Sequence, residues 1–69
     1  MTDDEDYNIK RGKHMEQIGD QHSQSQEYLK AAKLYRDSFN HFKKAGDKAS
    51  CLRLKEKFEK SRDKAKENQ

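Results

Sequence analysis

The 69-residue chain contains no proline and no tryptophan, and its only glycines are Gly12, Gly19 and Gly46. Proline and glycine are the residues that most often interrupt helices, so long helices can form between these three positions. An all-α fold is therefore predicted. No segment approaches the roughly 20 apolar residues that cross a bilayer. The acidic start, residues 2–6, also differs from a secretory leader, which is basic and then apolar.

Metal-binding and catalytic signatures are missing as well. Zinc sites use closely spaced ligand pairs, whereas His14, His22, His41 and Cys51 form no such pair. The chain offers no glycine-rich phosphate loop and no second element that would build an oxyanion pocket beside Cys51. We therefore expect no enzyme activity, no cofactor and no metal. Because a lone cysteine cannot form an internal disulfide, we expect an intracellular setting, cytoplasmic or nuclear.

The composition is highly polar, with 29% hydrophobic and 42% charged residues. This ratio approaches that of disordered chains. A chain of this length buries only about 60% of its unfolded surface, so the core must be thin. Periodicity nevertheless predicts folding, because apolar residues recur at steps of three and four along one helical stripe. These residues are Tyr28, Ala31, Ala32, Tyr35, Phe39 and Phe42.

Three helices are expected, over residues 4–22, 26–45 and 48–66. They form one domain, residues 7–66, with a flexible acidic lead at 1–6 that could instead be a first helical turn, and a frayed tail at 67–69.

Turn chemistry predicts how these helices are capped. Thr2 and Glu5 are spaced as a capping box for the first helix, and Ser23 or Ser25 can cap the second. Gly46 is expected as a left-handed carboxyl cap, followed by Asp47 as the amino cap of the third helix.

The spacing Met15-x2-Ile18-Gly19-x2-His22-x5-Tyr28-x2-Ala31-x3-Tyr35-x2-Ser38 resembles one tetratricopeptide repeat (TPR). The match covers one unit of about 34 residues, half the chain, with Met15, His22 and Ser38 where that family usually has Trp, Tyr and Ala. The resemblance implies a helical hairpin that packs closely at Gly19 and Ala31, with His22 in an aromatic slot and the third helix as a cap. The predicted packing residues are Met15, Ile18, Gly19, Tyr28, Ala31, Phe39, Phe42, Leu54 and Phe58.

The chain resembles two further families of helical proteins. Residues 35–47 are similar to the helical repeats of SNAP-type vesicle-fusion adaptors. The chain also resembles MIT domains, three-helix bundles with an Ala-x-x-Leu-Tyr second helix and a basic third helix. Both resemblances imply protein binding. Because an isolated repeat is marginal, either the three helices close into a compact bundle or two copies stack as a homodimer.

Basic residues are concentrated near the carboxyl end. Residues 43–66 contain ten basic and four acidic residues, a net charge of +6. Nucleic-acid binding requires a continuous basic face, and Glu56, Glu59 and Asp63 interrupt this one. A solvated helix face is the favoured interpretation, and an acidic peptide or helix is a better-matched partner than DNA.

We therefore predict a non-catalytic protein-interaction module that binds a partner helix or peptide between its second and third helices. Leu29, Tyr35 and Leu52 are the predicted apolar anchors, and Lys55 and Arg62 are expected to steer a charged partner. In the competing interpretation these leucines belong to a set of apolar residues that completes the three-helix core: Tyr7, Ile9, Met15, Leu29, Leu34 and Leu52. The alternative functions are MIT-like binding of ESCRT-type helical motifs and a small basic nucleic-acid-binding protein, and no membrane insertion is expected.

Overall fold

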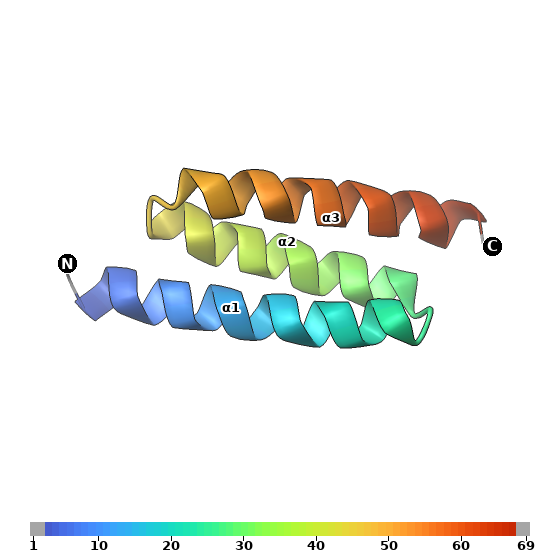
Figure 1. Cartoon of the computed structure of the whole chain (residues 1–69), viewed down its shortest axis with the longest axis horizontal. Coiled ribbons are helices and arrows are strands. Elements are labelled where there is room, and N and C mark those ends of the chain that lie inside the picture. The colour runs from blue at the N-terminus through green and yellow to red at the C-terminus, as the bar shows by residue number, and fades with distance from the viewer. Residues whose placement is uncertain (1–2, 68–69) are drawn as a thin grey trace.

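The protein folds into three antiparallel helices in the computed structural model, which describes residues 3–67. Helix α1 spans Asp3–Gln24, α2 spans Tyr28–Lys44 and α3 spans Lys48–Glu67. They lie side by side with α2 in the middle, and the amino terminus is at the same end as the α2–α3 turn (Figure 1). Residues 3–67 contain no strand. The prediction of an all-α, three-helix fold is confirmed.

The helix boundaries differ from the predicted ones by one or two residues, except at the amino end of α3, which begins at Lys48 as predicted. Helix α1 begins at Asp3, so the acidic residues up to Asp6 form its first turns rather than a flexible lead. The proposed capping-box residue Thr2 lies outside the described residues. Helix α2 begins at Tyr28, two residues later than expected, and α3 continues through Glu67. Of the predicted frayed tail, positions 68 and 69 lie outside the described residues.

The two turns between helices have the same backbone design. In the first, the amide of Glu27 donates to the carbonyl of His22 at 2.8 Å, five residues back, and Gln26 has a φ of 62°. In the second, the amide of Asp47 donates to the carbonyl of Phe42 at 3.0 Å, and Gly46 has a φ of 75°. Both are Schellman motifs, in which one left-handed residue ends the helix. The expected role of Gly46 is confirmed.

The caps that follow these turns differ in quality. Asp47 accepts hydrogen bonds from the backbone amide and the hydroxyl of Ser50, at 3.1 and 2.7 Å, so it caps α3 as predicted. The prediction for α2 is wrong: Ser23 lies inside α1 and Ser25 lies in the turn. Glu27 occupies the cap position instead, and its side chain makes no capping hydrogen bond.

Glycines allow α1 and α2 to approach closely. A Cβ atom on Gly12 would lie 2.9 Å from the ring of Phe42, and one on Gly19 would lie 2.8 Å from the ring of Tyr35. Both distances are too short for real carbon contacts, so any larger residue would separate the helices. The hydroxyl of Ser38 donates to the carbonyl of Gly12 at 2.6 Å and closes the same interface.

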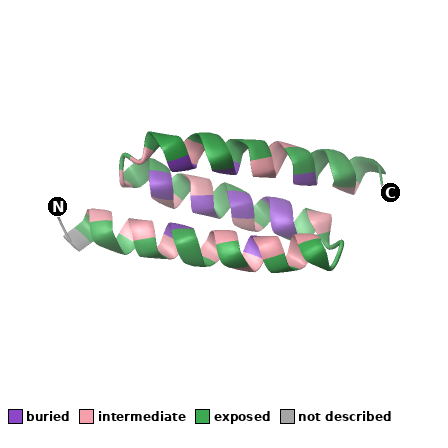
Figure 2. Ribbon diagram, in the orientation of Figure 1, coloured by how far each residue is buried: buried purple, intermediate pink, exposed green. Residues whose placement is uncertain are grey.

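The core is centred on α2, as the distribution of buried residues along the ribbon shows (Figure 2). Ala31, Tyr35, Phe42 and Leu54 form the buried hydrophobic cluster, and partly buried residues from all three helices surround it. Helix α2 packs along both neighbours, whereas the backbones of α1 and α3 come close at few points. The molecule is elongated and thin, with Cα extents of 42 × 17 × 12 Å.

Candidate functional site

Helices α1 and α3 are connected by ion pairs across α2. The guanidinium of Arg53 donates two hydrogen bonds to the carboxylate of Glu16, at 2.8 and 2.9 Å. The ammonium of Lys57 lies 2.9 Å from Glu16 and 3.1 Å from Asp20. These two cations are therefore paired with α1, contrary to the prediction that the basic side chains of this helix are simply solvated. The paired carboxylates neutralise both charges and leave little there for a partner to recognise.

The same cations cover the aromatic rings that contact the glycines. Arg53 lies 5.8 Å from the ring centre of Phe42, and Lys57 lies 5.7 Å from that of Tyr35. Each ring is thus enclosed between a glycine of α1 and a cation of α3, a favourable cation–π arrangement. We call this part of the molecule, made of Gly12, Gly19, Tyr35, Phe42, Arg53, Lys57, Glu16 and Asp20, the ring layer.

Glu16 is the carboxylate of the ring layer that pairs with both cations of α3. Its side chain is 13% exposed. The hydrogen bond from Arg53 is the main cause that lowers the pKa of Glu16 from 4.5 to about 2, and Lys57 adds to the effect against the cost of burial. Hydrogen bonding to Glu16 raises the pKa of Arg53 in turn. The ion pair therefore stabilises the fold as long as Glu16 is ionised.

Tyr35 belongs to this layer and cannot serve as a partner anchor. It is only 3% exposed, and its hydroxyl donates to the carboxylate of Asp20 at 2.6 Å. Burial, followed by the hydrogen bond to Asp20, raises the pKa of the Tyr35 hydroxyl. The predicted anchoring role of Tyr35 is corrected: it is a core residue that faces α1.

The face between α2 and α3 is hollowed along its whole length. Three hollows of about 330, 400 and 530 Å³ follow one another, and neighbouring hollows share lining residues. Phe39 and Lys55 belong to two of them, as do Arg36, Phe58 and Arg62. We call this continuous depression the α2/α3 groove.

Buried and half-buried apolar groups form the floor of the groove, and two exposed leucines and the exposed cations form its edges. Its lining includes one acidic residue, Glu59, and seven basic ones. The apolar lining residues are Leu29, Ala32, Phe39, Cys51, Leu52, Phe58 and Ala65, and the basic ones are Lys33, Arg36, Lys43, Lys48, Lys55, Arg62 and Lys66. Among these cations, Arg62 pairs with the carboxylate of Asp63 at 3.6 Å, between side chains that are 46% and 63% exposed.

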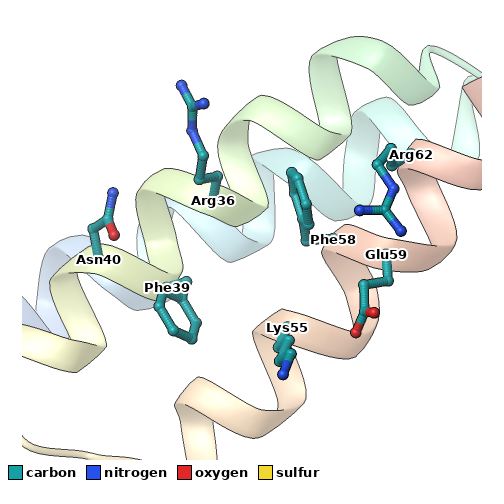
Figure 3. A pocket seen from close by; sticks show the side chains of 7 residues that line it. All are labelled: Arg36, Phe39, Asn40, Lys55, Phe58, Glu59 and Arg62. Carbon is teal, nitrogen blue, oxygen red and sulfur yellow. The ribbon is translucent and has the colours of Figure 1, made fainter.

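The central hollow shows this arrangement in detail (Figure 3). The rings of Phe39, from α2, and Phe58, from α3, lie between the two helices, with charged side chains along both sides. Arg62 lies 5.7 Å from the ring centre of Phe58. An apolar side chain that entered here would contact two aromatic rings, and an acidic neighbour would meet Arg36, Lys55 or Arg62.

The structure brings together four of the five predicted partner residues. Leu29 and Leu52 are 60% and 67% exposed and line the groove together with Lys55 and Arg62. The alternative that the remaining apolar residues complete the core is therefore wrong for the two leucines and for Tyr7, which is 58% exposed, whereas Ile9 does pack against the core.

The predicted packing residues occupy several environments. Gly19, Ala31, Phe42 and Leu54 are buried, whereas Phe39 and Phe58 are half-buried and also face the groove. The other packing residues are half-buried: Met15, Ile18 and Tyr28.

Sequence reasoning missed most of the groove cations. A signal was present, because the groove positions follow alternating steps of four and three on both helices. On α2 these positions are 29, 33, 36, 40 and 43, and on α3 they are 48, 52, 55, 59, 62 and 66. A second helical stripe beside the core stripe, mostly basic with leucines, marks the groove.

Two of the three histidines make side-chain hydrogen bonds, whereas His14 is exposed on α1. His22 is hydrogen-bonded to the carboxylate of Glu27 at 3.0 Å beside the first turn, rather than filling an aromatic slot. His41 is hydrogen-bonded to the side chain of Asn8 at 2.8 Å and so links α2 to α1. Among the described residues, no group of three or more His, Cys, Asp or Glu side chains could hold a metal ion. None of the helices within residues 3–67 is long and apolar enough to cross a membrane.

Comparisons with protein-family models, with curated proteins and with solved structures found no match to this chain.

Proposed function

We propose that this protein is a non-catalytic interaction module that binds an acidic amphipathic helix of a partner protein in the α2/α3 groove. The observation that carries the proposal is the lining of the groove, where exposed leucines and two phenylalanine rings lie between seven cations and a single carboxylate. Such a lining is complementary to a helix with an apolar stripe flanked by Asp and Glu.

The length and period of the groove favour a helix as the occupant. The groove positions of α3 extend from Lys48 to Lys66, which is about 27 Å along a helix. Their steps of four and three match the spacing at which a second helix presents its own apolar side chains. A partner helix of about 18 residues would fill this length.

The TPR-like spacing in the first half of the chain supports the same class of function, as does the similarity to SNAP-type repeats and MIT domains. TPR-like hairpins and MIT domains bind helices or peptides, and MIT domains bind ESCRT-type helical motifs between their second and third helices. The position of the groove between α2 and α3 agrees with that mode of binding. Cys51, the single thiol, supports an intracellular setting.

Nucleic-acid binding is the competing function. The seven groove cations favour it, whereas the apolar floor between them favours a protein helix, because phosphates gain nothing from contact with leucine. The two functions differ in salt dependence, since counterion release makes nucleic-acid affinity fall steeply with salt.

A designed peptide provides the test. The probe is a synthetic acidic helix of about 18 residues with leucines at steps of three and four and glutamates beside them, and its control carries lysines in place of the glutamates. Cys51 lines the groove, so bound peptide should slow alkylation of its thiol. We expect the acidic probe to protect Cys51 and the lysine probe to leave it unprotected.

Variants show whether protection comes from the groove. Leu52→Asp and Lys55→Glu should each weaken binding of the acidic probe about tenfold or more, whereas His14→Asp, on the exposed side of α1, should not change it. Equal binding by Leu52→Asp and the unmodified protein would contradict the proposal. Tight binding of a DNA or RNA oligonucleotide that is lost between low and moderate salt, with no protection by the peptide, would favour the competing function.

A further inference from the structure

The amino-terminal turn of α1 has a composition that suits the α2/α3 groove. Residues 3–6 are all acidic, and Tyr7 follows them with 58% of its surface exposed. Asp4 is exposed, and Asp6 pairs with Lys10 at 3.4 Å, between side chains that are both more than half exposed. Such a surface pair is weak and easily exchanged for another. The turn thus offers carboxylates next to an aromatic side chain.

The hollow nearest to the α2–α3 turn offers the complementary groups. It has a volume of about 530 Å³ and is lined by Phe39, Cys51 and Leu52 together with three lysines, Lys43, Lys48 and Lys55. No acidic residue lines it. An aromatic ring would fit its apolar part, and carboxylates beside that ring would meet the lysines.

The acidic turn cannot reach this hollow within its own molecule. Helix α1 is continuous from Asp3 and is held against the far side of α2, where Asn8 bonds to His41 at 2.8 Å and Tyr7 contacts the same histidine ring. The groove lies on the side of α2 that faces α3. The occupant must therefore come from a second molecule.

Helix α1 begins at the end of the bundle where α2 and α3 are joined (Figure 1), and Gly46 and Lys48 of that junction line the hollow. A twofold axis near that end would place each acidic turn over the lysine-lined hollow of the other copy, so both contacts form together.

We propose that the protein forms a weak reciprocal homodimer in which Tyr7 and the acidic first turn of each copy occupy the α2/α3 groove of the other. This inference rests on the proposed function of the groove, because the dimer and the partner helix use the same site. A contact confined to one end of each bundle is small for a stable interface, so a partner helix that fills the whole groove displaces it. Self-association thereby keeps the groove covered until a partner binds.

A charge-swap experiment by sedimentation equilibrium tests the dimer. The first variant, Asp4→Lys with Asp6→Lys, places lysines over lysines, and the second, Lys43→Glu with Lys48→Glu, places carboxylates over carboxylates. Each variant alone is expected to dimerise at least about tenfold more weakly than the unmodified protein. An equimolar mixture restores both contacts in a mixed dimer, so dimers should reappear. The matched control for the first variant is Asp37→Lys with Glu56→Lys. It also replaces two carboxylates with two lysines, but at exposed positions outside the three hollows, so it should dimerise normally.

The outcomes separate this inference from the proposed function. Circular dichroism establishes that each variant is folded. A monomeric unmodified protein, undiminished dimerisation of the first variant, or a mixture that stays monomeric would overturn the dimer. If the acidic probe still protects Cys51 in those cases, the groove function stands alone. If the charge swap restores dimers but the probe leaves Cys51 unprotected, the dimer stands and the partner-binding proposal fails.

Discussion

The two interfaces of α2 differ in how they are filled. Toward α1, glycines let the rings of Phe42 and Tyr35 approach the backbone, and Ser38 bonds directly to a carbonyl. Toward α3, larger side chains hold the helices apart on one face and leave the α2/α3 groove. In the proposed function, α2 thus serves the fold on the side of α1 and partner binding on the side of α3. Stability and binding should therefore respond to different residues.

The largest expected effect is on the buried side of this comparison. Phe42 is 1% exposed and packs against Gly12, so Phe42→Ala should destabilise the protein by about 3–5 kcal/mol. Phe39 is half-buried in the groove, so Phe39→Ala should cost only about 1–2 kcal/mol. Urea denaturation followed by circular dichroism measures both. Equal losses would mean that the two interfaces do not differ as described.

The ion pairs of the ring layer give the next effect, and it depends on pH. The folded-state pKa of Glu16 is about 2, below its ordinary value of 4.5. Its contribution is therefore fully present above pH 4.5 and is lost as the pH falls toward 2. Glu16→Gln should cost about 2 kcal/mol at pH 7 and weaken the acid dependence of unfolding. Glu56→Gln, at an exposed position on α3, is the control, and identical pH profiles for Glu16→Gln and the unmodified protein would refute the assignment.

The substitution Gly19→Ala tests whether the close contact between Gly19 and the Tyr35 ring outweighs the gain in helix propensity. Replacing a helical glycine with alanine gains about 1 kcal/mol of propensity. At this position the new Cβ would meet the Tyr35 ring, which Asp20 and Lys57 hold in place, so Gly19→Ala should still destabilise by about 1 kcal/mol. In a Tyr35→Val background the penalty should disappear, as a double-mutant cycle would measure. A stabilising Gly19→Ala would show that the interface is loose.

Substitutions in the two turns should change the stability least, and the two changes should have opposite signs. Gln26 adopts the left-handed conformation without the freedom of glycine, whereas Gly46 adopts it at no steric cost. Gln26→Gly should therefore stabilise the protein by about 0.5–1 kcal/mol, and Gly46→Gln should destabilise it by about 1 kcal/mol. Thermal unfolding of the two variants tests the swap, and changes of the same sign would contradict it.

Local chemistry made the second turn predictable from sequence but not the first. Gly46 and Asp47 are the residues that a left-handed cap and an amino cap prefer, and both take these roles. The first turn uses Gln26 and Glu27, which have no such preference, while Ser23 and Ser25 do not cap α2. Tertiary packing therefore fixes where α1 ends.

Pairing between helices was the part that sequence could not supply. Burial on α2 follows the helical repeat of its apolar stripe, where Ala31, Tyr35 and Phe42 are buried, although Tyr35 is predicted from the sequence as a partner anchor. The carboxylates that pair with Arg53 and Lys57 lie at least 37 residues away along the chain, and no local pattern identifies them. Helix propensity alone marks Gly12 as unfavourable within α1, whereas its lack of a side chain is what admits the ring of Phe42.

The most direct test of the account is a nuclear magnetic resonance titration of the ¹⁵N-labelled protein with the acidic amphipathic peptide. The account predicts that shifted backbone amides concentrate along the groove stripes of α2 and α3, including Leu29, Arg36, Leu52 and Lys55, while the ring-layer positions Gly12 and Gly19 stay unchanged. Shifts centred on α1, or a spectrum that does not respond to the peptide, would contradict it.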